Sequence, residues 1–262
     1  MDREFLTIST LCFAFAMVRT VVSLRAGKYR PAGFNFFAIA FGFIFQTAFL
    51  ALRGREIGRC PITNLFEVFV FLAWSVTLIY LLVGPTYRLS LMGAFTAPLV
   101  FALQTFALLA PIDVWHPLQR SPSIWLDFHA SISLVAYGSF ALACVAGLMY
   151  LVQERQLKRR QLNSMFHYFP PLPDLFAALT RLLWLGFFLL TLGIISGFLT
   201  RQPLPYGKVA WSLGVWIFYG AILLARHLRT APHRVAALCV VAFSVALTLL
   251  WGITFISQTH SM

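Results

Sequence analysis

Two histidines at the ends of apolar segments are the residues of this chain best suited to bind a metal. His129 lies at the start of one such segment, and His260 follows the last one. Histidine nitrogen is a common iron ligand, and two imidazoles can fill both axial positions of a haem iron. The simpler interpretation is that His129 is an ordinary headgroup-level residue and that His260 belongs to a polar chain end.

The composition predicts that membrane helices carry these histidines. The 262 residues are 60% hydrophobic and only 11% charged, and the mean hydropathy is +0.82. A bilayer requires spans of about 20 apolar residues, and long continuous spans are helices rather than barrel strands. We therefore expect an all-α polytopic protein, a single domain over residues 1–262, with eight spans near 5–24, 34–52, 64–83, 89–110, 128–152, 176–199, 208–225 and 235–256.

The distribution of lysine and arginine predicts the orientation of these spans. With eight spans, both termini share one side, which holds seven cations, while the other side holds thirteen. The positive-inside rule places the richer side in the cytoplasm. Both termini, and with them His129 and His260, are therefore expected on the outer side of the membrane.

The outer side also offers groups that suit a flat anionic cofactor. Haem has two propionates, which cations can bind, and an apolar ring, which aromatic side chains can cover. The candidate cations are Arg59, Arg120, Arg201 and Lys208, and the candidate walls are Trp115, Trp125, Tyr206 and Trp211. The alternative is that these aromatic residues form the ordinary interfacial belt of a membrane protein.

Glu67 lies about one turn inside the third predicted span, where an unpaired carboxylate is costly. We expect it to be structural, supported by Arg59 or by the amides of the helix start. Asn64 or Thr63 would cap that start.

The charge distribution and the cysteine pattern argue against nucleic-acid binding and against a cysteine-based redox or haem-attachment motif. The net charge of +12 is spread over several joints beside lipid, which favours anionic headgroups as partners over nucleic acid. The densest basic run, residues 154–160, is expected to be a solvated helix extension. The chain has no C-x-x-C pair and no haem-attachment C-x-x-C-H motif, so its four cysteines are expected to be free, small packing residues.

Several ordered motifs resemble a known family. Residues 58–67 read G-R-C-P-I-T-N-L-F-E, similar to the motif G-H-x-P-L-S-N-L-Y-E, and residues 129–138 resemble the helix that carries a periplasmic histidine. Residues 190–197 and the pattern Lys208-x-x-Trp211 resemble the flanks of a tryptophan-rich loop. The chain is thereby identified as a member of the cytochrome c assembly superfamily, of the CcsA (ResC) type, with departures like those of HemX.

The resemblance implies haem handling during cytochrome c maturation in the bacterial inner membrane. It implies that His129 and His260 hold one haem, expected to be haem b, beside the tryptophan-rich loop. It also implies a CcsB-like membrane partner and apocytochrome c as partners.

The chain departs from the family at three places. The loop at residues 198–207 is shorter than the family's W-W-D loop and lacks tryptophan, Leu224 stands where a span histidine would be, and Arg59 replaces the motif histidine. These departures argue against full synthetase activity and leave two alternatives. One is a HemX-like regulator of tetrapyrrole synthesis, and the other is a transporter of a small solute.

Overall fold

Eight helices make up most of the described part of the chain. The computed structural model describes residues 2–25, 33–83, 92–110, 112–113, 124–160, 170–200 and 206–259. In these ranges the helices are α1 (Asp2–Arg25), α2 (Gly33–Ile57), α3 (Leu65–Val83), α4 (Met92–Leu109), α5 (Ile124–Lys158), α6 (Leu172–Phe198), α7 (Tyr206–His227) and α8 (Pro232–Thr259).

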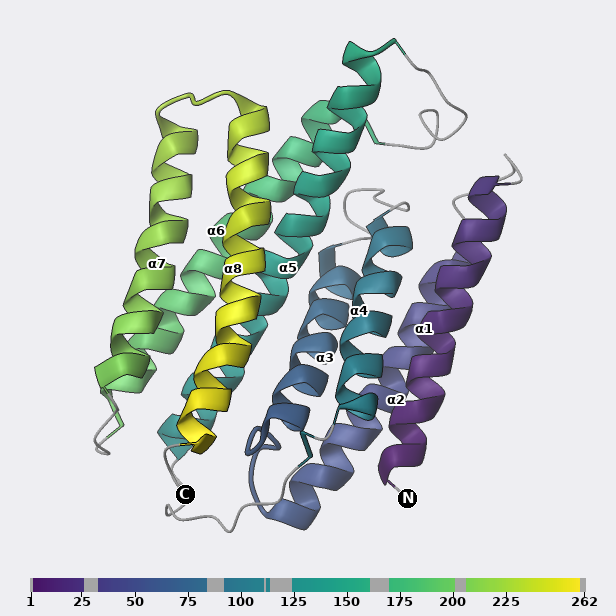
Figure 1. Ribbon diagram of the computed structural model, residues 1–262. Coiled ribbons are helices and arrows are strands. Elements are labelled where there is room, and N and C mark those ends of the chain that lie inside the picture. The colour runs from purple at the N-terminus through teal and green to yellow at the C-terminus, as the bar shows by residue number, and fades with distance from the viewer. Residues whose placement is uncertain are drawn as a thin grey trace.

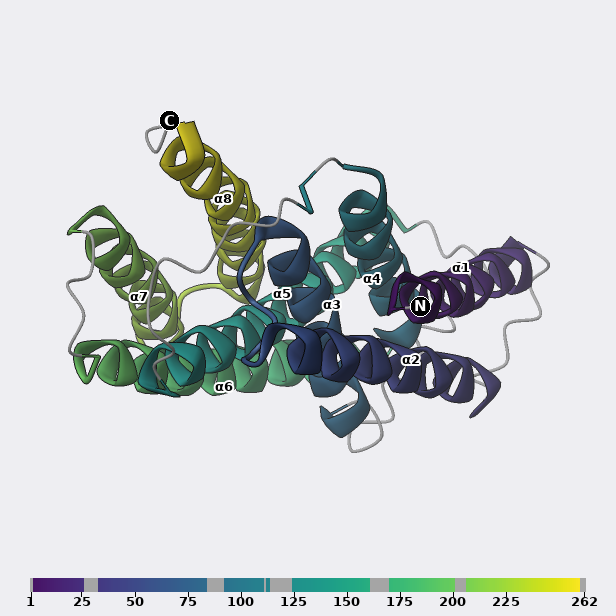
Figure 2. The same ribbon diagram turned by 90° about the horizontal axis from the view of Figure 1, so that it is seen from below.

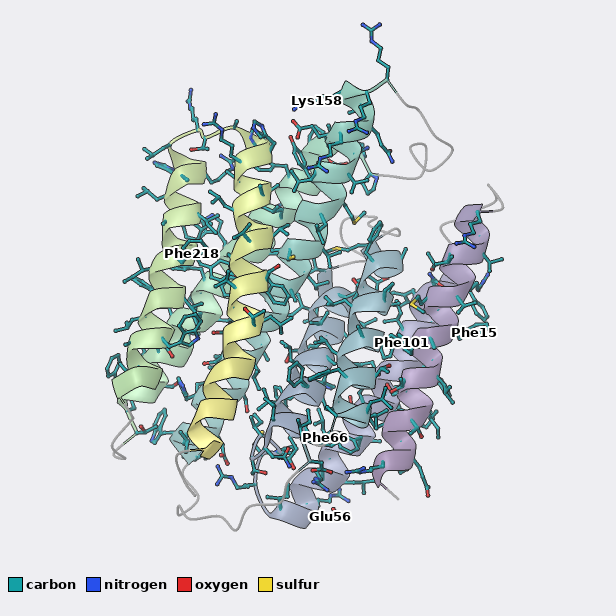
Figure 3. The ribbon with its side chains drawn as sticks, viewed as in Figure 1. Phe15, Glu56, Phe66, Phe101, Lys158 and Phe218 are labelled. Atoms are coloured by element: carbon teal, nitrogen blue, oxygen red, sulfur yellow. The ribbon has the colours of Figure 1, made fainter. Side chains whose placement is uncertain are left out.

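The prediction of long apolar helices that can cross a membrane is confirmed. Helices α1 to α7 are each long and apolar enough to cross a bilayer, and the shorter apolar part of α8 runs over Pro232–Thr248. Side chains such as Phe15 and Phe218 lie on the outside of the bundle, where hydrocarbon would surround them (Figure 3). The chain is thus a polytopic helical membrane protein.

The helices alternate in direction, so that α1 begins at the same end of the bundle at which α8 ends (Figure 1). This agrees with the prediction that both termini share one side. The same end holds the start of α5, and we call it the His129 end. That this end is the outer one remains a prediction from the charge distribution.

Helix α5 is the central helix of the bundle because it packs against α3, α6 and α8. Figure 2 shows α3 and α5 between the α1–α2 pair on one side and α6–α7 on the other. A Cβ added to Gly138 of α5 would lie 2.8 Å from the Cβ of Ser75 in α3, so these helices meet at close range. Small residues allow this approach.

Helix α5 extends well beyond the hydrocarbon thickness. It continues to Lys158, which lies at the end opposite the His129 end and forms an ion pair of 2.9 Å with Glu154 (Figure 3). The predicted helical extension at residues 154–160 is therefore confirmed as far as Lys158. Two arginines complete the turn that follows it, and the backbone of Arg160 has a positive φ of 52°.

Candidate functional site

The imidazole of His129 is fixed by a helix backbone far away in sequence. Its Nδ1 lies 2.6 Å from the carbonyl oxygen of Gly193 in α6. A carbonyl oxygen can only accept a hydrogen bond, so Nδ1 must carry the hydrogen. In a neutral imidazole this leaves the lone pair on Nε2, the atom that would bind a metal. Nε2 makes no hydrogen bond with the described residues.

Two glycines of α6 give the ring its place. A Cβ on Gly197 would lie 2.9 Å from Nδ1 of His129, and a Cβ on Gly193 would lie 2.6 Å from the hydroxyl oxygen of Ser133. Both distances are too short for a real contact, so a larger residue at either position would force the facing side chain of α5 to move. The ring is partly buried at this contact.

The first turns of α5 are also tied to the segment at residues 58–64, which follows α2. Gly58 ends α2 with a φ of 73°, a conformation that favours glycine, and so turns the chain toward α5. Arg59 then donates a hydrogen bond of 2.8 Å to Asp127, and both side chains are largely covered. This ion pair lies two residues from His129 and therefore limits how the start of α5 can move.

Cys60 makes a second link between the same two segments. Its sulfur lies 3.2 Å from the hydroxyl oxygen of Ser131. Burial raises the pKa of the Cys60 thiol, an effect that the hydrogen bond to Ser131 partly opposes. The thiol is therefore protonated at neutral pH and acts as a packing group. All four cysteines are free, as expected.

Glu67 is fully buried and serves the start of α3. Its Oε2 accepts hydrogen bonds of 2.7 Å from both the backbone amide and the hydroxyl of Thr63. In return, the side-chain oxygen of Asn64 accepts a hydrogen bond of 2.9 Å from the Glu67 amide, so Asn64 is the N-cap. Asn64 as the cap agrees with expectation.

The amide of Thr63 supports Glu67, in line with one of the two expectations, but the cation beside Glu67 is Arg53 and not Arg59. The Nε of Arg53 donates a hydrogen bond of 3.0 Å to Glu67, while Arg59 is taken up by Asp127. The correction has a geometric cause: Arg53 lies in the last turns of α2, which runs antiparallel beside α3, whereas Arg59 lies beyond the turn, on the side facing α5. An ion pair with Asp127 also makes Arg59 less available to a propionate.

Asp113 joins Arg53 and Glu67 in a larger group that we call the polar cluster. Asp113 accepts hydrogen bonds from Arg53 (2.8 Å) and from the side-chain amide of Asn64 (3.0 Å). It also forms an ion pair with Arg3 of α1. The guanidinium of Arg3 also lies 5.5 Å from the ring centre of Phe66. Sequence reasoning missed Asp113, whose position between Pro111 and a further proline gave no motif.

The structure does not bring all the predicted site residues together. His260, Arg120 and Arg201 lie outside the described residues, and of Lys208 only the backbone, in α7, is described. Trp211 of α7 packs against the core, and its indole nitrogen is buried near Tyr137 of α5. Within the described ranges, no group of three or more histidine, cysteine or acidic residues could hold a metal ion.

The residues present fit one side of a haem site. His129 offers one imidazole nitrogen of fixed tautomer, which suits an axial position of iron in a porphyrin because the porphyrin itself supplies the other ligands. His227 and His233 lie at the opposite end of the bundle, as the topology predicted, and His233 is 3.9 Å from Glu154. They cannot share a ligand with His129.

The family model and the relatives found by comparison with known proteins agree on one family. A family model described as "Cytochrome C assembly protein" matches residues 62–260. A CcsA cytochrome c biogenesis protein of Synechococcus sp. (strain CC9902) is 30% identical, with 78% of this chain and 77% of the relative covered. The CcsA protein of Prochlorococcus marinus (strain MIT 9301) is 25% identical over 95% of this chain and 91% of its own length. That of Porphyra purpurea is 24% identical over 98% and 97%. These relatives favour the CcsA-like interpretation over the HemX-like one.

Proposed function

Because this chain belongs to the cytochrome c assembly protein family, we propose that it binds haem at the His129 end and delivers it during cytochrome c maturation. The observation that carries the proposal is the hydrogen bond between His129 and the Gly193 carbonyl. It fixes the tautomer and the direction of the ring before any ligand arrives. A carbonyl that accepts a hydrogen bond from the other ring nitrogen commonly orients a metal-binding histidine and raises its basicity.

In this proposal His129 and His260 would hold a haem b through its iron. Bound haem would supply that iron. The chain would hold the ring of His129 against α6 through Gly193 and Gly197, and Trp211 would cover part of the porphyrin. Arg120, Arg201 and Lys208 are the proposed propionate partners, while Arg59 acts through its ion pair with Asp127.

The proposed setting is the inner membrane of a bacterium, with the His129 end outside the cytoplasm. Apocytochrome c would receive haem there, and a CcsB-like membrane protein would be the partner. The relatives are named cytochrome c biogenesis proteins, which supports apocytochrome c as the acceptor of the haem. The proposal covers haem binding and delivery only, because the loop at 198–207 is short and lacks tryptophan.

The haem content of the purified protein tests the proposal. We expect the full chain, expressed with haem supplied and purified in detergent, to retain haem, and His129→Ala to retain several-fold less. The matched control is His227→Ala. His227 is exposed and ends α7 at the end of the bundle opposite the His129 end. Equal haem in the wild type and in His129→Ala would refute the assignment of His129, and a wild type without haem would refute the function.

A further inference from the structure

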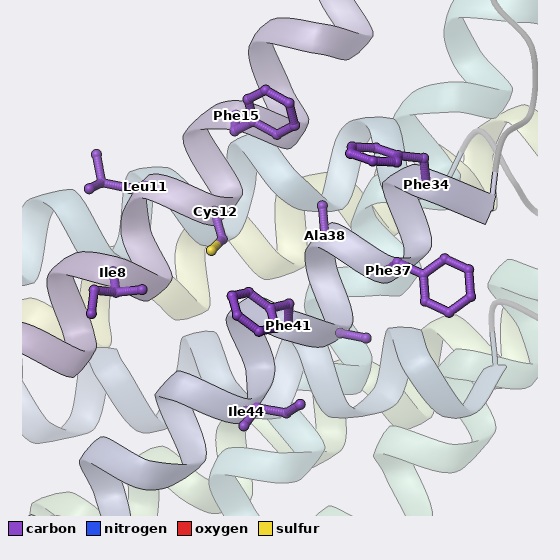
Figure 4. Close-up of a pocket in the computed structure, with 10 residues that line it drawn as sticks. Ile8, Leu11, Cys12, Phe15, Phe34, Phe37, Ala38, Phe41 and Ile44 are labelled. Carbon is purple, nitrogen blue, oxygen red and sulfur yellow. The ribbon is translucent and has the colours of Figure 1, made fainter.

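An apolar groove runs along the outside of the bundle between α1 and α2. It has a volume of about 630 Å³ (Figure 4). Its floor holds small side chains, Cys12 and Ala38, and its walls are large apolar side chains such as Leu11, Phe37 and Phe41. Leu11 is 68% exposed and Phe37 is 69% exposed, so the protein itself leaves these walls uncovered.

The groove is built into the helix pair, because α1 and α2 are fixed to each other beside it. Ser9 of α1 donates a hydrogen bond of 2.9 Å to the carbonyl of Gly42 in α2. Toward the other end, the side-chain amide of Asn35 donates one of 2.7 Å to Thr20. These bonds lie on the buried side of the pair and hold the spacing that leaves the groove open on the exposed side.

A cation lies at one end of the groove. The guanidinium of Arg19 is 4.0 Å from the ring centre of Phe34, which lines the groove. Among the described residues Arg19 has no acidic partner. It lies one helical turn beyond Phe15 and six residues before the end of α1 at Arg25, so its long side chain can reach headgroup level. That end of α1 is the one predicted to be cytoplasmic.

We propose that this groove binds one anionic phospholipid, with an acyl chain along the floor and its phosphate on Arg19. The groove lies within two membrane spans, so a chain of hydrocarbon is the chemistry that matches its walls. The cation at its end favours an anionic ligand, and a membrane-spanning partner helix or a second copy would have to supply an acidic side chain at the same depth. A phospholipid supplies both features in one molecule, and its binding does not depend on haem.

Native mass spectrometry of the full chain in detergent tests this proposal. The probes are phosphatidylglycerol and phosphatidylcholine with identical acyl chains. We expect the wild type to retain one phosphatidylglycerol in preference to phosphatidylcholine. Arg19→Gln should weaken phosphatidylglycerol binding about fivefold, because a basic residue near the membrane surface has an effect of that order on anionic lipid. The same change should weaken phosphatidylcholine binding less, because the choline ammonium of that lipid offsets the charge of its phosphate.

One further variant and two controls separate the groove from the cation. Ala38→Trp fills the floor and should weaken the binding of both lipids. The matched controls are Arg25→Gln, an exposed cation at the end of the same helix, and Val241→Trp on the exposed face of α8. Neither should change lipid retention, and unaltered helical circular dichroism shows that each variant is folded.

Three outcomes would overturn the proposal. One is equal retention of the two lipids by the wild type, and another is an Arg19→Gln variant that still prefers phosphatidylglycerol. The third is a protein dimer, or a complex with another membrane protein, that Ala38→Trp dissociates. That result would assign the groove to a protein partner.

Discussion

At the scale of single residues, the contact between His129 and the Gly193 carbonyl decides which chemistry the imidazole can perform. The hydrogen bond occupies Nδ1 and leaves the lone pair of Nε2 to bind a metal. A histidine with neither ring nitrogen hydrogen-bonded could adopt either tautomer, and its tautomer would be fixed only when the ligand binds. The fixed ring also explains why a glycine is needed at 197, where a side chain would collide with it.

The first residue-scale prediction concerns Gly197. Gly197→Ala should displace the His129 ring, because the added Cβ would lie 2.9 Å from Nδ1. We expect a several-fold loss of haem affinity in a haem titration. Gly214→Ala is the control, since a Cβ there meets nothing within 4 Å. Unchanged affinity in Gly197→Ala would show that the ring position does not matter for binding.

The second concerns Glu67, which we expect to be structural. Glu67→Gln removes the charge that faces Arg53, so the free energy of unfolding should fall by about 1–3 kcal/mol, as for a charged hydrogen bond. Denaturation followed by circular dichroism in detergent measures this. The absorption spectrum of haem in the folded variant should not change. Normal stability with selective loss of haem would place Glu67 in the haem site instead.

At the scale of elements, the segment 58–64 and the start of α5 act as a unit through the Arg59–Asp127 ion pair. We predict that Arg59→Gln and Asp127→Asn each lower stability and that their effects are not additive. The coupling free energy should be about 0.5–3 kcal/mol, as for residues in direct contact. A double-mutant cycle measures it, with denaturation as the readout. Additive losses would mean that the two side chains act separately.

The elements themselves could be predicted from the sequence better than their contacts could. A bilayer forces long apolar segments to be helices, so the spans follow from local sequence, as do Asn64 and Thr63 as the two candidate N-caps, of which the structure selects Asn64. The partner of Glu67 could not be found this way, because Arg53 and Arg59 are both nearby in sequence and only the antiparallel packing of α2 on α3 selects Arg53. The partner of His129 is a backbone atom 64 residues away, for which sequence carries no side-chain signal.

At the scale of the whole molecule, eight alternating helices place both described chain ends at the His129 end (Figure 1). The polar cluster of Arg3, Arg53, Glu67 and Asp113 lies at this same end and connects α1, α2, α3 and the segment after α4. The opposite end carries the denser positive charge, including Arg155 and Lys158. The bundle is therefore asymmetric in charge along the membrane normal, which is what orients membrane proteins.

A reporter that is active only in the cytoplasm tests this orientation. Fused after Met262, it should give no signal, because the thirteen-to-seven division of cations puts that end outside. The same reporter inserted after Arg229, between α7 and α8, should be active. The reverse pattern would place His129 on the cytoplasmic side and remove it from any site that apocytochrome c reaches.

The absorption spectrum of the haem-loaded protein tests the role of His129 most directly. With His129 and His260 as the two axial ligands, the wild type should show a low-spin haem. His129→Ala should shift the spectrum to high-spin, and added imidazole should restore much of the low-spin signal by occupying the vacated position. A low-spin spectrum that is identical in the wild type and in His129→Ala would contradict the proposed ligation.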